Sequence, residues 1–257
     1  MHPSVTQSSQ GSAETHSSLR IRHAGERGHT RLDWLESYHT FSFGDYEDTA
    51  WMGFGPLRVI NDDWIAPAGG FGMHGHRDME ILTCVLEGEL AHEDSLKNGA
   101  TITPGEWQRM TAGTGIRHSE FNASDDRPVH LLQIWIQPDQ PGLAPGYEQK
   151  SFSGSLQPRQ WQLIASPTGE GGSLIIHQQA RVYQALLFAG EAIDYAPSPG
   201  RGLWLHVATG SVQLGGQLLR AGDAISLLAS GPTEQLVLSG TAAQSHLILF
   251  DLPIPGL

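Results

Sequence analysis

The stretch that decides the fold, residues 71–122, opens with FGMHGHRDME and closes with TAGTGIRHSEFN. Each end holds a pair of polar side chains separated by one residue, His74 and His76 in the first and His118 and Glu120 in the second. Side chains at positions i and i+2 of a β-strand point to the same side of the strand. If the two strands face each other inside a barrel, three imidazoles and one carboxylate surround one point.

These residue types at this spacing predict a metal site. Imidazole nitrogens and carboxylate oxygens bind borderline divalent cations at about 2.0–2.2 Å, so the side chains must converge within a few ångströms. The chain has 13 histidines, and a single histidine is usually a surface or hydrogen-bonded core residue, so one pair alone is weak evidence. The second pair, which follows a Gly-rich turn, favours a metal site over chance.

Short strands separated by turns are expected for most of the N-terminal half of the chain. Residues 81–86 form an apolar run typical of a buried strand, and Cys84 within it is expected to be a small core residue. Turns containing Gly and Pro separate further expected strands, at residues 57–60, 89–93, 100–103, 107–110 and 129–137. Asn61, Asp62 and Asp63 have turn-forming side chains, so a turn is expected there.

Aromatic residues are concentrated before the first histidine pair, with seven of the chain's 20 between residues 34 and 54. Clustered aromatic side chains are mostly core, so this segment is expected to cover one face of the barrel rather than to stack on a ligand. The two roles are compatible, because one side of a packed segment can also line a cavity.

The second half repeats the first without its candidate ligands. Two ungapped alignments, anchored at Gly88 with Gly210 and at Gly105 with Gly222, compare the halves. In these alignments, the positions equivalent to the four candidate ligands hold Ala196, Ser198, Gln235 and Val237. The histidines that remain in this half are far apart in sequence and are interpreted as ordinary core or surface residues: His177, His206 and His246.

Length and composition restrict the class of protein. A chain of 257 residues is long enough for two domains of about 110 residues each. The net charge of −12 argues against nucleic-acid binding as a main activity, because that affinity comes largely from Lys and Arg. The single cysteine excludes an intramolecular disulfide and suits a reducing compartment, so a cytoplasmic location is expected.

The two ends of the first half are expected to be irregular. Residues 1–18 contain no Lys, no Arg and no apolar run, so a disordered tail is expected rather than a signal peptide. Residues 138–149 are rich in Pro and Gly and are interpreted as a linker, which places a domain boundary near residue 145. No apolar run approaches the roughly 20 residues that cross a bilayer, so a soluble protein without membrane contact is expected.

Several motifs are similar to those of the pirin family of bicupins, in particular its bacterial branch described as quercetin 2,3-dioxygenases. They are ERGH (26–29), HTFSF (39–43), LRVINDD (57–63), GFGMHGHRDMEILTCVLEG (70–88), MTAGTGIRHSE (110–120) and QIWI (133–136). Together with the strand pattern, the resemblance implies an all-β fold of two tandem cupin barrels, also called double-stranded β-helices or jelly rolls. The expected domains are an N-terminal metal-binding cupin at 19–145 and a C-terminal degenerate cupin without metal at 146–257.

The resemblance also implies a metal and a reaction. One divalent ion is expected, with His74, His76, His118 and Glu120 as ligands. The expected ion is Fe(II), with Ni, Mn, Co, Cu and Zn as alternatives. Cupins generally take their carboxylate from shortly after the first histidine pair, where Glu80 stands. Pirins use the later carboxylate, so Glu80 is expected outside the metal's ligands, hydrogen-bonded to a ligand imidazole.

The implied activity is oxygenolytic opening of the heterocyclic ring of a flavonol such as quercetin, with release of carbon monoxide. Glu120 is expected to act also as the base that takes the proton of the flavonol 3-hydroxyl. The expected partners are therefore a flavonol and O2. Two alternatives stay open: a metal-binding, redox-sensitive co-regulator that contacts other proteins, and a cupin dioxygenase with another substrate. The oligomeric state is left open.

Overall fold

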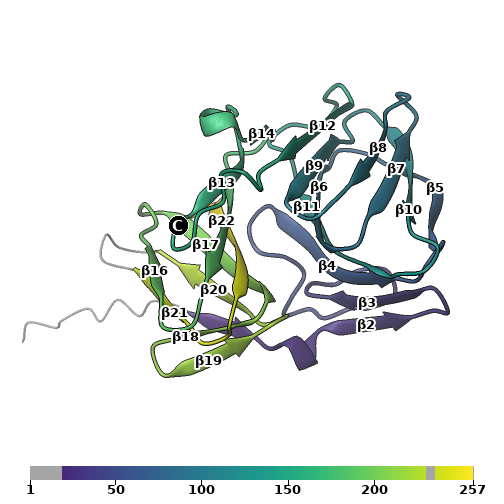
Figure 1. The fold of residues 1–257 in the computed structure, drawn as a ribbon. Helices are drawn as coiled ribbons and strands as arrows, with labels where there is room; N and C mark the ends of the chain where they lie inside the picture. Colours follow the sequence, from purple (N-terminus) through teal and green to yellow (C-terminus); the bar gives the residue numbers. More distant parts are fainter. Residues whose placement is uncertain (1–18, 230–234, 257) are drawn as a thin grey trace, which may run out of the picture.

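The structure, a computed structural model, describes residues 19–229 and 235–256. Figure 1 shows two barrels side by side, each built from one seven-stranded and one four-stranded sheet. The expected all-β fold of two tandem cupin barrels is confirmed. The expected disordered tail at residues 1–18 lies outside the described residues.

The first barrel contains the stretch that carries the candidate ligands. Its large sheet has the strand order β12-β9-β6-β11-β4-β3-β2, and its small sheet has the order β5-β10-β7-β8. The strands are β2 (Gly28–Arg31), β3 (Leu35–His39), β4 (Leu57–Ile65), β5 (Gly70–His76), β6 (Glu80–Glu87), β7 (Leu90–Asp94), β8 (Gly99–Ile102), β9 (Glu106–Thr111), β10 (Ile116–Asn122), β11 (Val129–Ile136) and β12 (Gly146–Ser151).

The second barrel repeats this arrangement. Its sheets have the orders β1-β20-β17-β22-β15-β13-β14 and β16-β21-β18-β19. The strands are β1 (Arg20–Arg22), β13 (Gln162–Ser166), β14 (Leu174–Ile175), β15 (Arg181–Leu187), β16 (Ala192–Tyr195), β17 (Arg201–Thr209), β18 (Ser211–Leu214), β19 (Gln217–Arg220), β20 (Ala224–Leu228), β21 (Leu236–Gly240) and β22 (Ser245–Pro253). Two 3₁₀ turns, η1 (Ala24–Glu26) and η2 (Glu170–Gly172), are the helical segments of the described ranges, and neither could span a bilayer.

The two halves exchange one strand in each direction. Strand β1 comes before the first barrel in sequence but pairs with β20 of the second. Strand β12 follows the linker but pairs with β9 of the first, so residues 146–149 belong to a strand rather than to the expected linker. The division into 19–145 and 146–257 stays a prediction, because each half completes a sheet of the other.

The turn expected at Asn61, Asp62 and Asp63 is wrong, since β4 runs through all three residues without interruption. These three side chains are polar because each side of the strand faces polar surroundings, not because the chain turns there. Asn61 and Asp63 line a cavity in the first barrel. Asp62 points the other way and binds Arg27 and His130. Tertiary contacts on both sides of the strand therefore override the local turn preference.

The large sheets of the two barrels pack against each other through a continuous apolar core. Trp204 of β17 lies at its centre, with the rings of Phe41, Trp51 and Phe54 at centroid distances of 4.7, 5.7 and 5.7 Å. The aromatic segment therefore does cover a face of the first barrel, and the surface that it packs against is the second barrel. Cys84 is buried in the same core, as expected.

The strand pairing corrects the sequence alignment of the halves by one residue. The pairing of β10 with β7 and of β21 with β18 fixes the equivalent positions. The residues equivalent to the second candidate pair are therefore Leu236 and Leu238 rather than Gln235 and Val237. Both leucines are buried in the apolar cluster that fills the second barrel. At these two positions the second barrel therefore has hydrocarbon side chains where the first has the candidate ligands His118 and Glu120.

Candidate metal centre

Strands β5 and β10 are antiparallel neighbours in the small sheet of the first barrel, and they bring the two candidate pairs together. Their register places His118 directly opposite His74. A bulge between His118 and Glu120 then shifts the pairing, so that Glu120 lies opposite Phe71. The three histidines of the two pairs therefore converge in space, whereas Glu120 forms a separate group with His92 and His118. The bulge is an irregularity that the i, i+2 spacing does not predict.

Three imidazoles form the centre of the cluster. Ligand atoms of His74, His76 and His118 all lie within 4.8 Å of one another. The Nε2 atoms of His76 and His118 are 3.0 Å apart. Two nitrogens bound at about 2.1 Å to one cation are separated by about 3.0 Å when the angle between them is 90°. The observed spacing therefore fits a shared cation.

The backbone fixes the orientation of one of these rings. His74 Nδ1 lies 2.8 Å from the carbonyl oxygen of Gly72, to which it donates a hydrogen bond. That bond places the proton on Nδ1 and leaves Nε2 free to bind a metal. Hydrogen bonds of this kind commonly hold the tautomer of a metal-binding histidine.

Glu120 is buried beside the imidazoles, with an exposed fraction of 3%. The amide of Gln133 donates to Glu120 Oε2 at 2.8 Å, and Thr83 in turn donates to Gln133 Oε1 at 2.9 Å. Oε1 of Glu120 has no hydrogen-bond partner among the described residues. An unpaired buried carboxylate oxygen is unfavourable unless a cation or a donor satisfies it, so this atom is suited to a metal.

Burial sets the charge of these groups. Burial and the neighbouring imidazoles lower the pKa of His118 to about 2, and the same causes lower the pKa of His76 to about 4. Both rings are therefore neutral at neutral pH, the form in which imidazole binds metals. Burial, together with the charge of Asp63, raises the pKa of Glu120 to about 7.

Glu80, the alternative carboxylate, lies outside this cluster. Thr111 donates a hydrogen bond to one of its carboxylate oxygens at 2.9 Å, and the Nδ1 atom of His177 lies 3.0 Å from the other. The expected hydrogen bond to a ligand imidazole is therefore wrong. Glu80 instead connects the first barrel to a histidine of the second half.

His92 is a member of the site that sequence reasoning missed. It is buried on β7, its Nδ1 lies 3.5 Å from that of His118, and its ring forms a second group with His118 and Glu120. The Nε2 of Gln108 lies 3.2 Å from His92 Nδ1. The available signal was the alternation on β7, where Leu90, His92 and Asp94 are buried and the residues between them are more exposed.

A cavity of about 290 Å³ opens beside the cluster. His74, His76 and Glu120 contribute to its lining. Its aromatic walls are Phe43, Phe71 and Trp135. Most of its other polar lining residues come from the large sheet: Thr30, Ser37, His39, Asn61, Asp63 and Gln133. Asp45 lines the cavity from the loop that follows Phe43. The cavity therefore combines flat apolar walls with the histidine cluster at one end and a polar wall.

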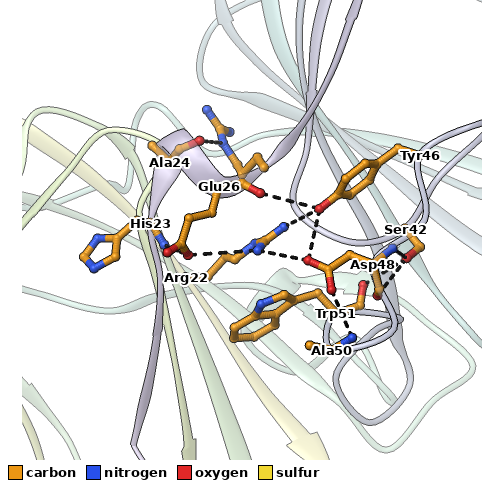
Figure 2. Close-up of polar contacts among 10 residues, drawn as sticks. Arg22, His23, Ala24, Glu26, Ser42, Tyr46, Asp48, Ala50 and Trp51 are labelled. Atoms are coloured by element: carbon orange, nitrogen blue, oxygen red, sulfur yellow. Dashed lines mark hydrogen bonds and ion pairs between the residues drawn. The ribbon is translucent and has the colours of Figure 1, made fainter.

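The second barrel holds the loop that borders this cavity. Arg22 of β1 donates to the hydroxyl of Tyr46 at 2.7 Å and to Asp48 at 3.3 Å, as Figure 2 shows. Its guanidinium also lies over the ring of Trp51, at 5.1 Å from the centroid. Arg22 is almost fully buried. Because Phe43 lines the cavity and bridges to Tyr46, this contact connects the cavity wall to the second barrel's sheet.

Comparison with known proteins supports this description. A family model described as pirin matches residues 20–136, and one described as the quercetinase C-terminal cupin domain matches residues 163–252. The quercetin 2,3-dioxygenase of Escherichia coli (strain K12) is 44% identical over 235 residues, which cover 91% of this chain and 99% of that protein.

Solved structures extend the likeness to the fold. Crystal structures of YhhW from Escherichia coli, one of them described as a bacterial pirin in complex with nickel(II), are 42% identical with a TM-score of 0.85. They cover 92% of this chain, and the match spans 98% and 99% of those chains. The double barrel, the histidine cluster and these relatives agree: the chain belongs to the pirin family.

Proposed function

We propose that this protein is a metal-dependent dioxygenase that opens the heterocyclic ring of flavonols such as quercetin with O2 and releases carbon monoxide. The observation that carries the proposal is the cluster of three imidazoles, with the buried carboxylate of Glu120 beside it, at the end of a cavity with aromatic walls. The names of the relatives support the same activity.

Four residues would hold the metal: His74, His76, His118 and Glu120. Fe(II) is the proposed ion, and the nickel(II) complex of the Escherichia coli pirin makes Ni(II) an alternative. A divalent ion bound there supplies positive charge that acidifies a chelating flavonol hydroxyl and an electronic centre for reaction with O2.

Glu120 would take the proton of the flavonol 3-hydroxyl while it stays beside the metal. Oε1 would bind the ion, and Oε2, which accepts one hydrogen bond from Gln133, would keep a lone pair for the proton. Burial raises the pKa of Glu120, which strengthens its carboxylate as a base. The resulting flavonolate is electron-rich and reacts with O2. The carbon that bore the hydroxyl leaves as carbon monoxide, and both atoms of O2 remain in the ester product.

The aromatic walls would orient the substrate. Trp135 packs edge-on against His76 at 4.9 Å and against Phe43 at 5.5 Å, so its ring is fixed on both sides. A flat polyphenol that fills the cavity excludes water from the carboxylate and from the reacting carbon. Exclusion of water prevents the flavonolate from being reprotonated by solvent before it reacts.

Turnover with gas analysis tests the proposal. Protein loaded with Fe(II) and given quercetin is expected to consume O2 and release carbon monoxide in equal amounts. Luteolin, which differs from quercetin in lacking the 3-hydroxyl, is the matched control and should give neither. Absence of carbon monoxide from fully metallated protein with several flavonols would overturn the dioxygenase proposal and leave the co-regulator as the alternative.

A further inference from the structure

Two carboxylates that the proposed reaction does not use line the cavity: Asp45, which is exposed, and Asp63, which is buried in the wall formed by the large sheet. Asn61 and Asp63 of β4 both face the cavity. Asn61 is satisfied, because its Oδ1 accepts a hydrogen bond from His39 Nδ1 at 2.8 Å and His39 Nε2 lies 2.9 Å from the hydroxyl of Thr30. This chain crosses strands β4, β3 and β2 and makes that part of the wall rigid.

Asp63 differs from its neighbours because part of its carboxylate is unpaired. The side chain is only 3% exposed, and Oδ1 has no hydrogen-bond partner among the described residues. Ser37 is the hydrogen-bonding neighbour on the next strand. Burial is the main cause that raises the pKa of Asp63, to about 7. A buried oxygen of this kind is stabilised when a ligand donates a hydrogen bond to it.

The surroundings of Asp63 restrict what such a ligand is. Phe43, Phe71 and Trp135 bound the cavity and suit an aromatic ring system. A carboxylate accepts hydrogen bonds from hydroxyl groups and repels carboxylates, sulfates and phosphates. A ring that carries phenolic hydroxyls satisfies both conditions, because each hydroxyl donates one hydrogen bond.

We propose that Asp63 is the residue that selects polyhydroxylated flavonols, with Oδ1 accepting a hydrogen bond from a phenolic hydroxyl other than the chelating 3-hydroxyl. This inference rests on the proposed function, since it assumes that a flavonol occupies the cavity with its 3-hydroxyl toward the histidine cluster. Asp63 determines specificity and does not touch the reacting atoms. Flavonols sulfated at the recognised hydroxyl are excluded.

Binding without turnover tests this role. Dissociation constants are measured under anaerobic conditions on metallated protein, from the change in tryptophan fluorescence as ligand fills the cavity beside Trp135. Two ligands are compared: quercetin, and 3-hydroxyflavone, which retains only the chelating hydroxyl and carbonyl. Asp63→Asn removes the charge and keeps the side chain's shape. Asp125→Asn, on an exposed loop, is the matched control for the change in net charge.

Asp63→Asn is expected to weaken quercetin binding at least tenfold and to change 3-hydroxyflavone binding by less than twofold, because a hydrogen bond to a charged group is lost with one ligand only. Equal weakening for both ligands, or none for either, would overturn the inference. Metal content equal to that of the wild type checks that the site is intact.

If the selective loss occurs but the wild type releases no carbon monoxide, the dioxygenase proposal fails and the recognition by Asp63 stands. If metallated wild type binds neither ligand, both proposals fail.

Discussion

His76 and His118 face each other through their Nε2 atoms at 3.0 Å, although they lie 42 residues apart in sequence. Both rings are neutral at neutral pH, and two imidazole nitrogens at this distance need a proton or a cation between them. Strands β5 and β10 hold this geometry through their pairing. The pairing of these two strands therefore places the two imidazoles close together although they are far apart in sequence.

A bound metal should stabilise the folded protein. A ligand present at about 1,000 times its dissociation constant adds about 4 kcal/mol to the free energy of unfolding if it binds only the folded state. Calorimetry should show that a chelator lowers Tm in the wild type and has no effect in His118→Ala. His23→Ala, which removes an exposed histidine, should respond to the chelator as the wild type does. An unchanged chelator response in His118→Ala would contradict the site.

Substitutions of the two candidate carboxylates, Glu120 and Glu80, should have different effects on turnover, metal content and stability. Glu120→Gln keeps an oxygen donor and removes the base, so turnover should fall by at least tenfold while metal content falls less. Glu80→Gln should leave metal content near that of the wild type and lower the free energy of unfolding by about 1–3 kcal/mol, because it weakens the contacts with Thr111 and His177. Loss of metal from Glu80→Gln, with full metal in Glu120→Ala, would reverse the assignment.

The buried histidine between the barrels should make stability depend on pH. His206 is fully buried, and burial together with the charge of Arg27 lowers its pKa to about 4. Asp62 and Asp223 act in the opposite direction, and His130 adds to the lowering. Neither ring nitrogen of His206 has a hydrogen-bond partner among the described residues. The folded state therefore holds this imidazole neutral.

The direction of this pH dependence follows from the pKa of His206 in the unfolded chain, about 6.5, and in the folded protein, about 4. Between about pH 6.5 and pH 4 the unfolded chain binds a proton at His206 that the folded protein does not, so the free energy of unfolding falls as the pH falls through this window. The full contribution is roughly 3 kcal/mol. Urea denaturation at pH 7 and pH 4.5 should show a smaller loss in His206→Leu than in the wild type. Parallel losses in both proteins would contradict the assignment.

The contact that holds the cavity loop should affect substrate binding. Arg22→Met removes the donor to Tyr46 and Asp48, so KM for quercetin should rise more than kcat falls, and the free energy of unfolding should fall by about 1–3 kcal/mol. Arg20→Met is the matched control, because Arg20 lies over the same Trp51 ring at 4.3 Å. Equal effects of the two variants would mean that stacking on Trp51, not the polar contact, positions the loop.

The sequence predicts those parts of the fold that local patterns determine. Residue pairs at i, i+2 predicted the strands that carry His74 and His118, and the repeated glycines predicted the second barrel. The exchange of β1 and β12 was not predictable, because no local pattern records which barrel a strand joins. The one-residue error in the alignment of the two halves, at Leu236 and Leu238, has a similar cause. The register of strand pairing determines which residues are equivalent, and the composition of the sequence does not show that register.

The polar wall of the cavity was the part of the site that the sequence predicted least well. Asn61, Asp62 and Asp63 have high turn preferences, so a turn was expected where the structure has a strand with buried polar side chains on both faces. His92 was missed because a single histidine on a strand is usually a surface or hydrogen-bonded core residue, so it did not indicate a site. In both places the polar residues are buried because they face a cavity or another side chain, and a single sequence does not show that partner.

We expect the chain to hold one metal ion, in the first barrel, through His74, His76, His118 and Glu120. Elemental analysis of freshly purified protein tests this most directly, with the metal counted per chain in the wild type and in the double variant His74→Ala plus His118→Ala. We expect one metal per chain in the wild type and less than about one tenth of that in the double variant, since removal of half of the ligands abolishes tight binding. Two tightly bound metals per wild-type chain, or full occupancy in the double variant, would contradict the claim.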